Sequence, residues 1–155
     1  MSDRAHEGRI DAPAWAWTML RQARVARLAT ADASGAPHLV PVCFVVRDGE
    51  LWTPIDGKPK STRSLRRVRN LAENPAASLL VDHYEEDWRE LRWVAVHGRA
   101  ELVAGVAAAA ALVALAEKYP QYMEVAVGSE AIRLTPSRIV TWSAADTRVE
   151  PGPMR

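Results

Sequence analysis

Residues 52–70 read WTPIDGKPKSTRSLRRVRN. The apolar and β-branched residues at 51–55 predict a strand, and Asp56 followed by Gly57 ends it. The second half predicts a helix, with an apolar stripe formed by Leu65, Val68 and Ala72. A strand that runs through a turn into a helix is therefore the unit around which the other elements are placed.

Positive charge is concentrated in this turn and in the helix that follows it. Residues 58–69 hold six basic side chains and no acidic one, although the whole chain has a net charge of only +1. Ser61 or Thr62 can cap the helix, but no Glu or Gln follows three residues later to complete a capping box. Amides at a helix N-terminus beside Lys and Arg side chains form a phosphate site. We expect this stretch to bind the phosphate of a cofactor.

The arrangement of these charges bears on the alternative, a solvated helix face. Arg63, Arg67 and Asn70 share one side of the helix at positions i, i+4 and i+7, opposite the apolar stripe. The charges also begin directly after a strand. Both features favour the phosphate site.

The composition is that of one globular domain. The chain has 155 residues, of which 48% are hydrophobic and 25% charged. The small net charge argues against a nucleic-acid binder, and no apolar run is long enough to span a membrane. A single cysteine, Cys43, excludes an internal disulfide, and the first 15 residues lack the apolar core of a signal peptide. We expect a cytoplasmic domain over 13–145, with loose tails at 1–12 and 146–155.

The other elements are strands and two helices, joined mostly by short turns. Asp48-Gly49 predicts a hairpin and Gly98 a bulge. Pro41 predicts either a bulge or a place where the strand ladder lacks a partner, and Pro136 bends a last strand or divides it into two. The order is neither strict βαβ alternation nor a series of hairpins. It predicts a mainly β (α+β) fold, a six-stranded, mostly antiparallel barrel with short helices at its rim. We place strands at 25–31, 38–46 (buried on both sides), 51–55, 77–82, 91–103 and 131–143, and helices at 13–23 and 104–118.

Motifs for acid–base, nucleophilic or metal chemistry are not found. The sequence contains no G-x-S-x-G, HExxH, Walker A or GxGxxG pattern. The acidic run 82–87 lacks a metal-ligand spacing, and Cys43 is expected to be a buried structural thiol. We therefore predict no metal and no catalytic side chain, and expect a bound cofactor to carry the chemistry. A haem-binding barrel is a further alternative, with His38, His83 or His97 as the axial ligand.

The order of these segments resembles a known family. The segments are RLATADASGAPHLVPV (27–42), the Asp-Gly hairpin, the strand with Trp52-Thr53, KPKSTRSLRRVRNLAENP (58–75) and ASLLVDHYEEDW (77–88). Together they look like the pyridoxamine 5′-phosphate oxidase-like superfamily of split β-barrels, which bind flavin mononucleotide (FMN) and related cofactors. Within it they are similar to the actinobacterial branch that uses the deazaflavin coenzyme F420. The resemblance covers about residues 13–145.

The resemblance implies a homodimer with the cofactor in a groove between the subunits. It implies that Thr53 lies near the cofactor chain and that Pro41 and Val42, on the adjoining strand, approach the ring with backbone groups. The phosphate-binding positions that it implies are Lys58, Lys60, Ser61 and Arg67. The serine–arginine–lysine turn of the flavin-using members is absent, which favours coenzyme F420 over FMN.

The expected function is that of an F420-dependent oxidoreductase. Such an enzyme transfers a hydride to an electron-poor small molecule, and its side chains orient the reactants and exclude water. Two alternatives stay open: an FMN-dependent oxidase or reductase on the same fold, and a non-catalytic protein that binds or carries the cofactor.

Overall fold

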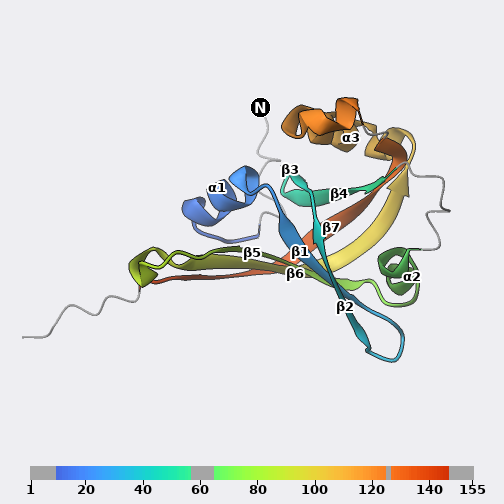
Figure 1. The fold of residues 1–155 in the computed structure, drawn as a ribbon. Helices are drawn as coiled ribbons and strands as arrows, with labels where there is room; N and C mark the ends of the chain where they lie inside the picture. The colour runs from blue at the N-terminus through green and yellow to red at the C-terminus, as the bar shows by residue number, and fades with distance from the viewer. Residues whose placement is uncertain (1–9, 57–64, 125–126, 147–155) are drawn as a thin grey trace, which may run out of the picture.

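A computed structural model describes residues 10–56, 65–124 and 127–146 of the protein (Figure 1). Seven antiparallel strands form one sheet in the order β2-β1-β5-β6-β7-β4-β3, and three α-helices pack on it. The α-helices and strands are α1 (Ala14–Gln22), β1 (Ala26–Ala31), β2 (Pro37–Val42), β3 (Val45–Arg47), β4 (Glu50–Asp56), α2 (Arg66–Glu73), β5 (Ala76–His83), β6 (Arg92–Ala104), α3 (Val106–Lys118) and β7 (Val127–Ser143). Two short 3₁₀ helices, η2 (Trp88–Glu90) and η3 (Pro120–Met123), complete the set.

The prediction of a mainly β, antiparallel fold with helices around it is confirmed, but the six-stranded barrel needs correction. The described sheet has seven strands and is not closed, because its edge strands β2 and β3 do not pair. The expected single strand at 38–46 is in fact two strands, since Cys43 and Phe44 interrupt it. The chain thus passes from one edge of the sheet to the other through Phe44, which is completely buried.

The expected burial of segment 38–46 on both sides is also wrong. In β2, exposed and more buried residues alternate, because this strand is at an edge and has one face on the core. Pro41, which has no N–H to donate, is tolerated there because only one side of an edge strand is paired.

The hairpin at Asp48-Gly49 and the bulge at Gly98 are confirmed, whereas β1 and β2 pair in continuous register, so there is no bulge at Pro41. Asp48 and Gly49 have φ of 51° and 76° and connect β3 to β4 in a tight hairpin. The pairing of β6 with β7 shifts register between His97 and Gly98, as expected for a bulge. A Cβ at Gly98 would lie 2.0 Å from the carbonyl oxygen of Thr135, so only glycine fits there. The last segment, which was expected to be one bent strand or two strands, is the single strand β7.

Two hydrophobic cores lie on opposite faces of β4. The main core lies on the side of the sheet where α1 and α2 also pack. The smaller core lies under α3 and joins Trp52 to Ala108, Ala111 and Ala131. The alanines of α3 allow this helix to approach the sheet closely, which accounts for their abundance. β4 is buried on both faces as a result, and it precedes the basic stretch.

The hydroxyl of Tyr119 connects the segment before β1 with the link between β2 and β3. It accepts a hydrogen bond from the amide of Phe44 at 3.1 Å and lies 3.0 Å from the carbonyl oxygens of Arg24 and Phe44. Lys118 Nζ donates to the same Phe44 carbonyl at 2.9 Å. Burial, together with nearby Arg24, lowers the pKa of Lys118 to about 8.

Replacing Tyr119 with phenylalanine should lower the free energy of unfolding by about 1–3 kcal/mol, because the Phe44 amide then loses its partner in a buried place. Urea denaturation followed by circular dichroism measures the loss. Tyr84→Phe is the matched control, since Tyr84 is 61% exposed. An equal effect of the two substitutions would contradict a bracing role for Tyr119.

Candidate functional site

Helix α2 carries Arg67 on the face that it buries. Arg67, Asn70 and Leu71 share one side of the helix at positions i, i+3 and i+4, and Asn70 and Leu71 are 2% and 7% exposed. Arg67 itself is half-buried, and its Nε is buried. Long side chains in a helix point back toward its N-terminus. The Arg67 side chain is therefore directed toward the N-terminal end of α2 along the protein side of the helix.

Polar contacts fix the rotation of α2 relative to β1. Asn70 Nδ2 donates to Thr30 Oγ1 at 3.0 Å, and both residues are buried. At the other end of the helix, the carboxylate of Glu73 accepts from the amide of Ala33 at 3.1 Å. This corrects the expectation that Asn70 belongs to an anion-binding face. Asn70 is a structural residue, and its contact holds Arg67 in place.

The expected start of this helix is also corrected. α2 begins at Arg66, and Leu65 before it is extended, with φ of −70° and ψ of 130°. Ser61 and Thr62 are therefore too early in the chain to cap α2. They lie outside the described residues, as do Lys58 and Lys60, so the phosphate roles expected for Lys58, Lys60 and Ser61 stay predictions.

The other basic side chains of α2 have different surroundings. Arg66 lies near Asp32 in the β1–β2 turn; the Ser34 hydroxyl, the amides of Ala36 and Ser34 and the Arg66 guanidinium all lower the pKa of Asp32. Arg69 is exposed. Arg67 is thus the basic residue of α2 that combines a cationic group with partial burial, the combination that favours a desolvated anion.

Thr53 lies on β4 with its side chain buried. It is 5% exposed and shares one side of the strand with Leu51 and Ile55, both in the main core. β3 pairs only with Glu50–Trp52, so within the described chain the side of β4 toward β3 has no strand partner from Thr53 onward. Backbone groups on such an edge are suited to hydrogen bonding with a ligand.

Pro41 and Val42 are not placed as expected. β2 pairs with β1, whereas β4 pairs with β7 and β3, so the strand of Pro41 and Val42 does not adjoin β4. Val42 is buried in the main core, on the same side of the sheet as Thr53. Pro41 is exposed on the other side. Among the described positions, Val42, Thr53 and Arg67 thus share the core side and Pro41 does not.

The remaining candidates have ordinary surroundings. Cys43 is partly exposed and not buried as expected, because it lies at the link between β2 and β3. In the described part of the chain, His, Cys, Asp and Glu form no cluster of three or more that could hold a metal ion. His97 Nδ1 is hydrogen-bonded to Ser78 Oγ at 2.7 Å, and His83 Nε2 lies 2.8 Å from a Glu85 carboxylate oxygen. None of the helices described has the length and hydropathy needed to cross a bilayer.

A feature that the sequence analysis missed is an apolar outer surface on the sheet. Leu39 on β2 is 67% exposed and Leu80 on β5 is 38% exposed. On the same side of the sheet, the neighbouring β6 and β7 add the half-buried residues Trp93, Val140 and Trp142. The alternation along each strand indicated which apolar residues point outward. That these residues form one surface follows only from the order of the strands in the sheet.

Comparisons with known proteins agree on the fold. The family model described as pyridoxamine 5'-phosphate oxidase matches residues 16–143. A 5a,11a-dehydrotetracycline/5a,11a-dehydrooxytetracycline reductase of Streptomyces rimosus is 35% identical over 126 residues, 81% of this chain and 78% of the relative. A conserved hypothetical protein from Mycobacterium tuberculosis has a similar structure, with a TM-score of 0.72 at 23% identity, covering 90% of this chain and 89% of that one. A flavin adenine dinucleotide-binding protein from Mesorhizobium loti has a TM-score of 0.64 at 20% identity, with 84% and 94% covered. The chain belongs to the pyridoxamine 5'-phosphate oxidase family, as the match over residues 16–143 establishes.

Proposed function

We propose that this protein is a reductase that uses coenzyme F420 to reduce an electron-poor double bond in a small molecule. The observation that carries the proposal is the 35% identity, over 81% of the chain, to a protein named as a reductase of a dehydrotetracycline. Family membership supports an oxidoreductase. The choice of coenzyme F420 over FMN rests on the resemblance of the basic stretch to the deazaflavin-using branch.

The residues on the core side fit a cofactor that carries a phosphate. Arg67 is a half-buried cation on a helix whose rotation is fixed, and it would hold the phosphate together with Lys58, Lys60 and Ser61. Thr53 and the unpaired edge of β4 would lie along the chain that joins phosphate and ring. When bound, the deazaflavin supplies the hydride; the protein orients the reactants and excludes water.

Proton transfer needs no dedicated side chain in this proposal. Tyr84, a weak acid by its side chain, is largely exposed, and its hydroxyl accepts from Trp88 Nε1 at 3.4 Å. We assign Tyr84 no role, and the substrate takes its proton from water.

The proposal is tested by titrating the purified protein with coenzyme F420 and, separately, with FMN, and following cofactor fluorescence. Binding of coenzyme F420 that is at least about tenfold tighter than that of FMN supports the proposal. Tighter binding of FMN would contradict the choice of coenzyme F420 and support an FMN-dependent oxidoreductase of the same fold. If neither binds, the basic stretch is a solvated surface.

A second assay separates an enzyme from a carrier. The reduced cofactor is mixed with an enone or a quinone, with and without the protein. Faster reoxidation in the presence of the protein supports a reductase, whereas bound cofactor that reacts no faster than free cofactor indicates a carrier. The same cytoplasmic location suits both, since Cys43 has no disulfide partner within the chain.

The protein acts as a homodimer in this proposal, with its outer sheet surface as the interface. Leu39, Leu80, Trp93, Val140 and Trp142 give this surface the apolar and aromatic character of an interface centre.

Replacing both Leu39 and Leu80 with glutamate is expected to convert the dimer to a folded monomer, because two like charges would face their symmetry mates in an apolar interface. Light scattering coupled to size-exclusion chromatography measures the mass. Val113→Glu together with Met123→Glu is the control, at positions 59% and 85% exposed and away from this surface. A double variant that keeps the dimer mass would place the interface elsewhere.

A further inference from the structure

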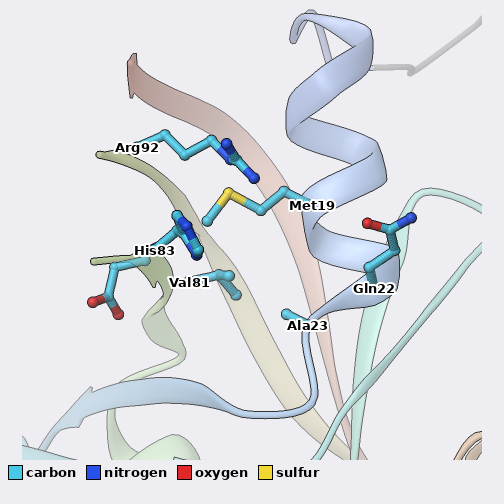
Figure 2. A pocket seen from close by; sticks show the side chains of 7 residues that line it. Met19, Gln22, Ala23, Val81, His83 and Arg92 are labelled. Carbon is cyan, nitrogen blue, oxygen red and sulfur yellow. The ribbon is translucent and has the colours of Figure 1, made fainter. Parts of the chain in front are cut away.

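A small pocket lies between α1 and the ends of β5 and β6, away from the basic helix (Figure 2). Its volume is about 200 Å³. This is below the range of about 300–1,000 Å³ that is usual for drug-sized ligands, so it suits a small metabolite. The residues that line it are Met19, Gln22, Ala23, Val81, Asp82, His83 and Arg92.

The pocket interrupts the apolar side of the sheet with two polar side chains. Strand alternation puts His83 on the same side as Val81, and Arg92 on the same side as Val94; the two valines are 3% and 0% exposed. His83 and Arg92 are directly opposite each other in the pairing of β5 with β6. On this side of the sheet, strand alternation predicts apolar residues at positions 83 and 92, but the chain has His83 and Arg92 there.

The acidic side chains near this pocket are already paired. Asp82 points to the other side of the sheet and forms a salt bridge with Arg27 at 3.1 Å. Glu85 is within 2.8 Å of His83 Nε2. Arg92 has no hydrogen bond or ion pair to its side chain among the residues that the structure describes. Because an arginine stays charged at all ordinary pH values, the described residues leave one positive charge in the pocket without an ion-pair partner.

The opposite wall of the pocket is apolar. Met19 projects from α1 and packs against the main core, and Ala23 and Val81 continue this surface. Figure 2 shows the side chains of Met19, His83 and Arg92 converging from the helix and the two strands. The flexible Met19 thioether can adapt to ligands of different shape.

We propose that this pocket binds a small monocarboxylate. The carboxylate accepts hydrogen bonds from the Arg92 guanidinium, whose two parallel N–H groups match its geometry. The carbon chain of the ligand packs against Met19, Ala23 and Val81. The site is separate from the proposed cofactor site, because β5 begins just after α2 and runs eight residues to the pocket, roughly 25 Å at about 3.3 Å per residue.

The test is a calorimetric titration of the full-length protein with hexanoate, and with hexanamide as the neutral probe. Hexanoate is expected to bind at least about tenfold more tightly than hexanamide, because only the acid can pair with Arg92. Arg92→Gln should lower the hexanoate affinity by a similar factor and leave coenzyme F420 binding unchanged. Arg89→Gln is the matched control, since Arg89 is exposed and paired with Asp87 outside the pocket.

A second variant guards against a folding defect in Arg92→Gln. Ala23→Leu fills the pocket and keeps Arg92, so it should also abolish hexanoate binding while the melting temperature stays near that of the native protein. Equal binding of hexanoate and hexanamide, no binding of hexanoate, or unchanged hexanoate affinity in folded Arg92→Gln would each overturn the proposal.

Discussion

Replacing Val96 with aspartate is expected to leave the protein unfolded under conditions in which the native chain is folded. Val96 is completely buried at the middle of β6, where it pairs with Leu79 of β5 and Ile139 of β7. A carboxyl group there has no partner and must either lose its hydration or take up a proton. The cost is about 4 kcal/mol or more, a large part of the roughly 5–15 kcal/mol that stabilise a domain. Urea denaturation followed by circular dichroism measures it.

The pH dependence of Val96→Asp supplies an internal check. Burial raises the pKa of the introduced carboxyl in the folded state above its value in the unfolded chain. The stability deficit relative to the native protein should therefore be smallest at low pH and should grow as the pH rises through the unfolded-state pKa of about 4. Val113→Asp is the control, since Val113 is 59% exposed on α3. If Val96→Asp has the same denaturation midpoint as the native protein, β6 is not a core strand.

Features that depend on neighbouring residues could be predicted from the sequence. Asp48-Gly49 adopts the positive φ angles that a two-residue hairpin requires, and Gly98 lies at a bulge where a side chain would collide with Thr135. In the β1–β2 turn, the Asp32 carboxylate accepts hydrogen bonds from the amides of Ser34 and Ala36, two and four residues later. The hairpin and turn signals act within a few residues of the chain, and a glycine inside a strand pattern by itself suggests a bulge, so no knowledge of the strand order was needed to predict them.

The division of segment 38–46 could not be predicted in the same way. Cys43 and Phe44 continue an apolar, β-branched run, and local propensity favours an uninterrupted strand. Their conformation is set by Tyr119, whose hydroxyl is hydrogen-bonded to the Phe44 amide across 75 positions of sequence. The division of this segment into β2 and β3 is why the sheet has seven strands where the sequence predicted six.

The sequence showed where the basic side chains are concentrated, but not which of them lie on the buried face of α2. The basic composition of 58–69 identified a helix suited to an anion, but the face of the helix that turns inward depends on what packs against it. Asn70 meets Thr30 of β1, so its side of the helix is the buried one, and Arg67 turns inward with it. The pocket beside α1 could not be predicted from the sequence for a similar reason. His83 and Arg92 become neighbours only through the register of β5 and β6.

Replacing Arg67 with alanine is expected to weaken binding of coenzyme F420 by about 1–3 kcal/mol, or roughly five- to hundredfold in the dissociation constant. The reason is that Arg67 offers a charge-assisted hydrogen bond from a half-buried position, where an anion is poorly screened by water. The measurement is the fluorescence titration used to test the cofactor. Arg69→Ala is the matched control, because Arg69 is on the same helix and is exposed.

A stability measurement on the same variants separates a binding role of Arg67 from a structural one. If Arg67 serves the cofactor, Arg67→Ala loses affinity while its denaturation midpoint stays close to that of Arg69→Ala, since Asn70 and Glu73 still fix the helix. Arg67→Lys should recover only part of the affinity, because an ammonium keeps the charge and loses the planar pair of donors. Native affinity in Arg67→Ala combined with a lowered midpoint would make Arg67 a packing residue and return the phosphate site to the residues that precede α2.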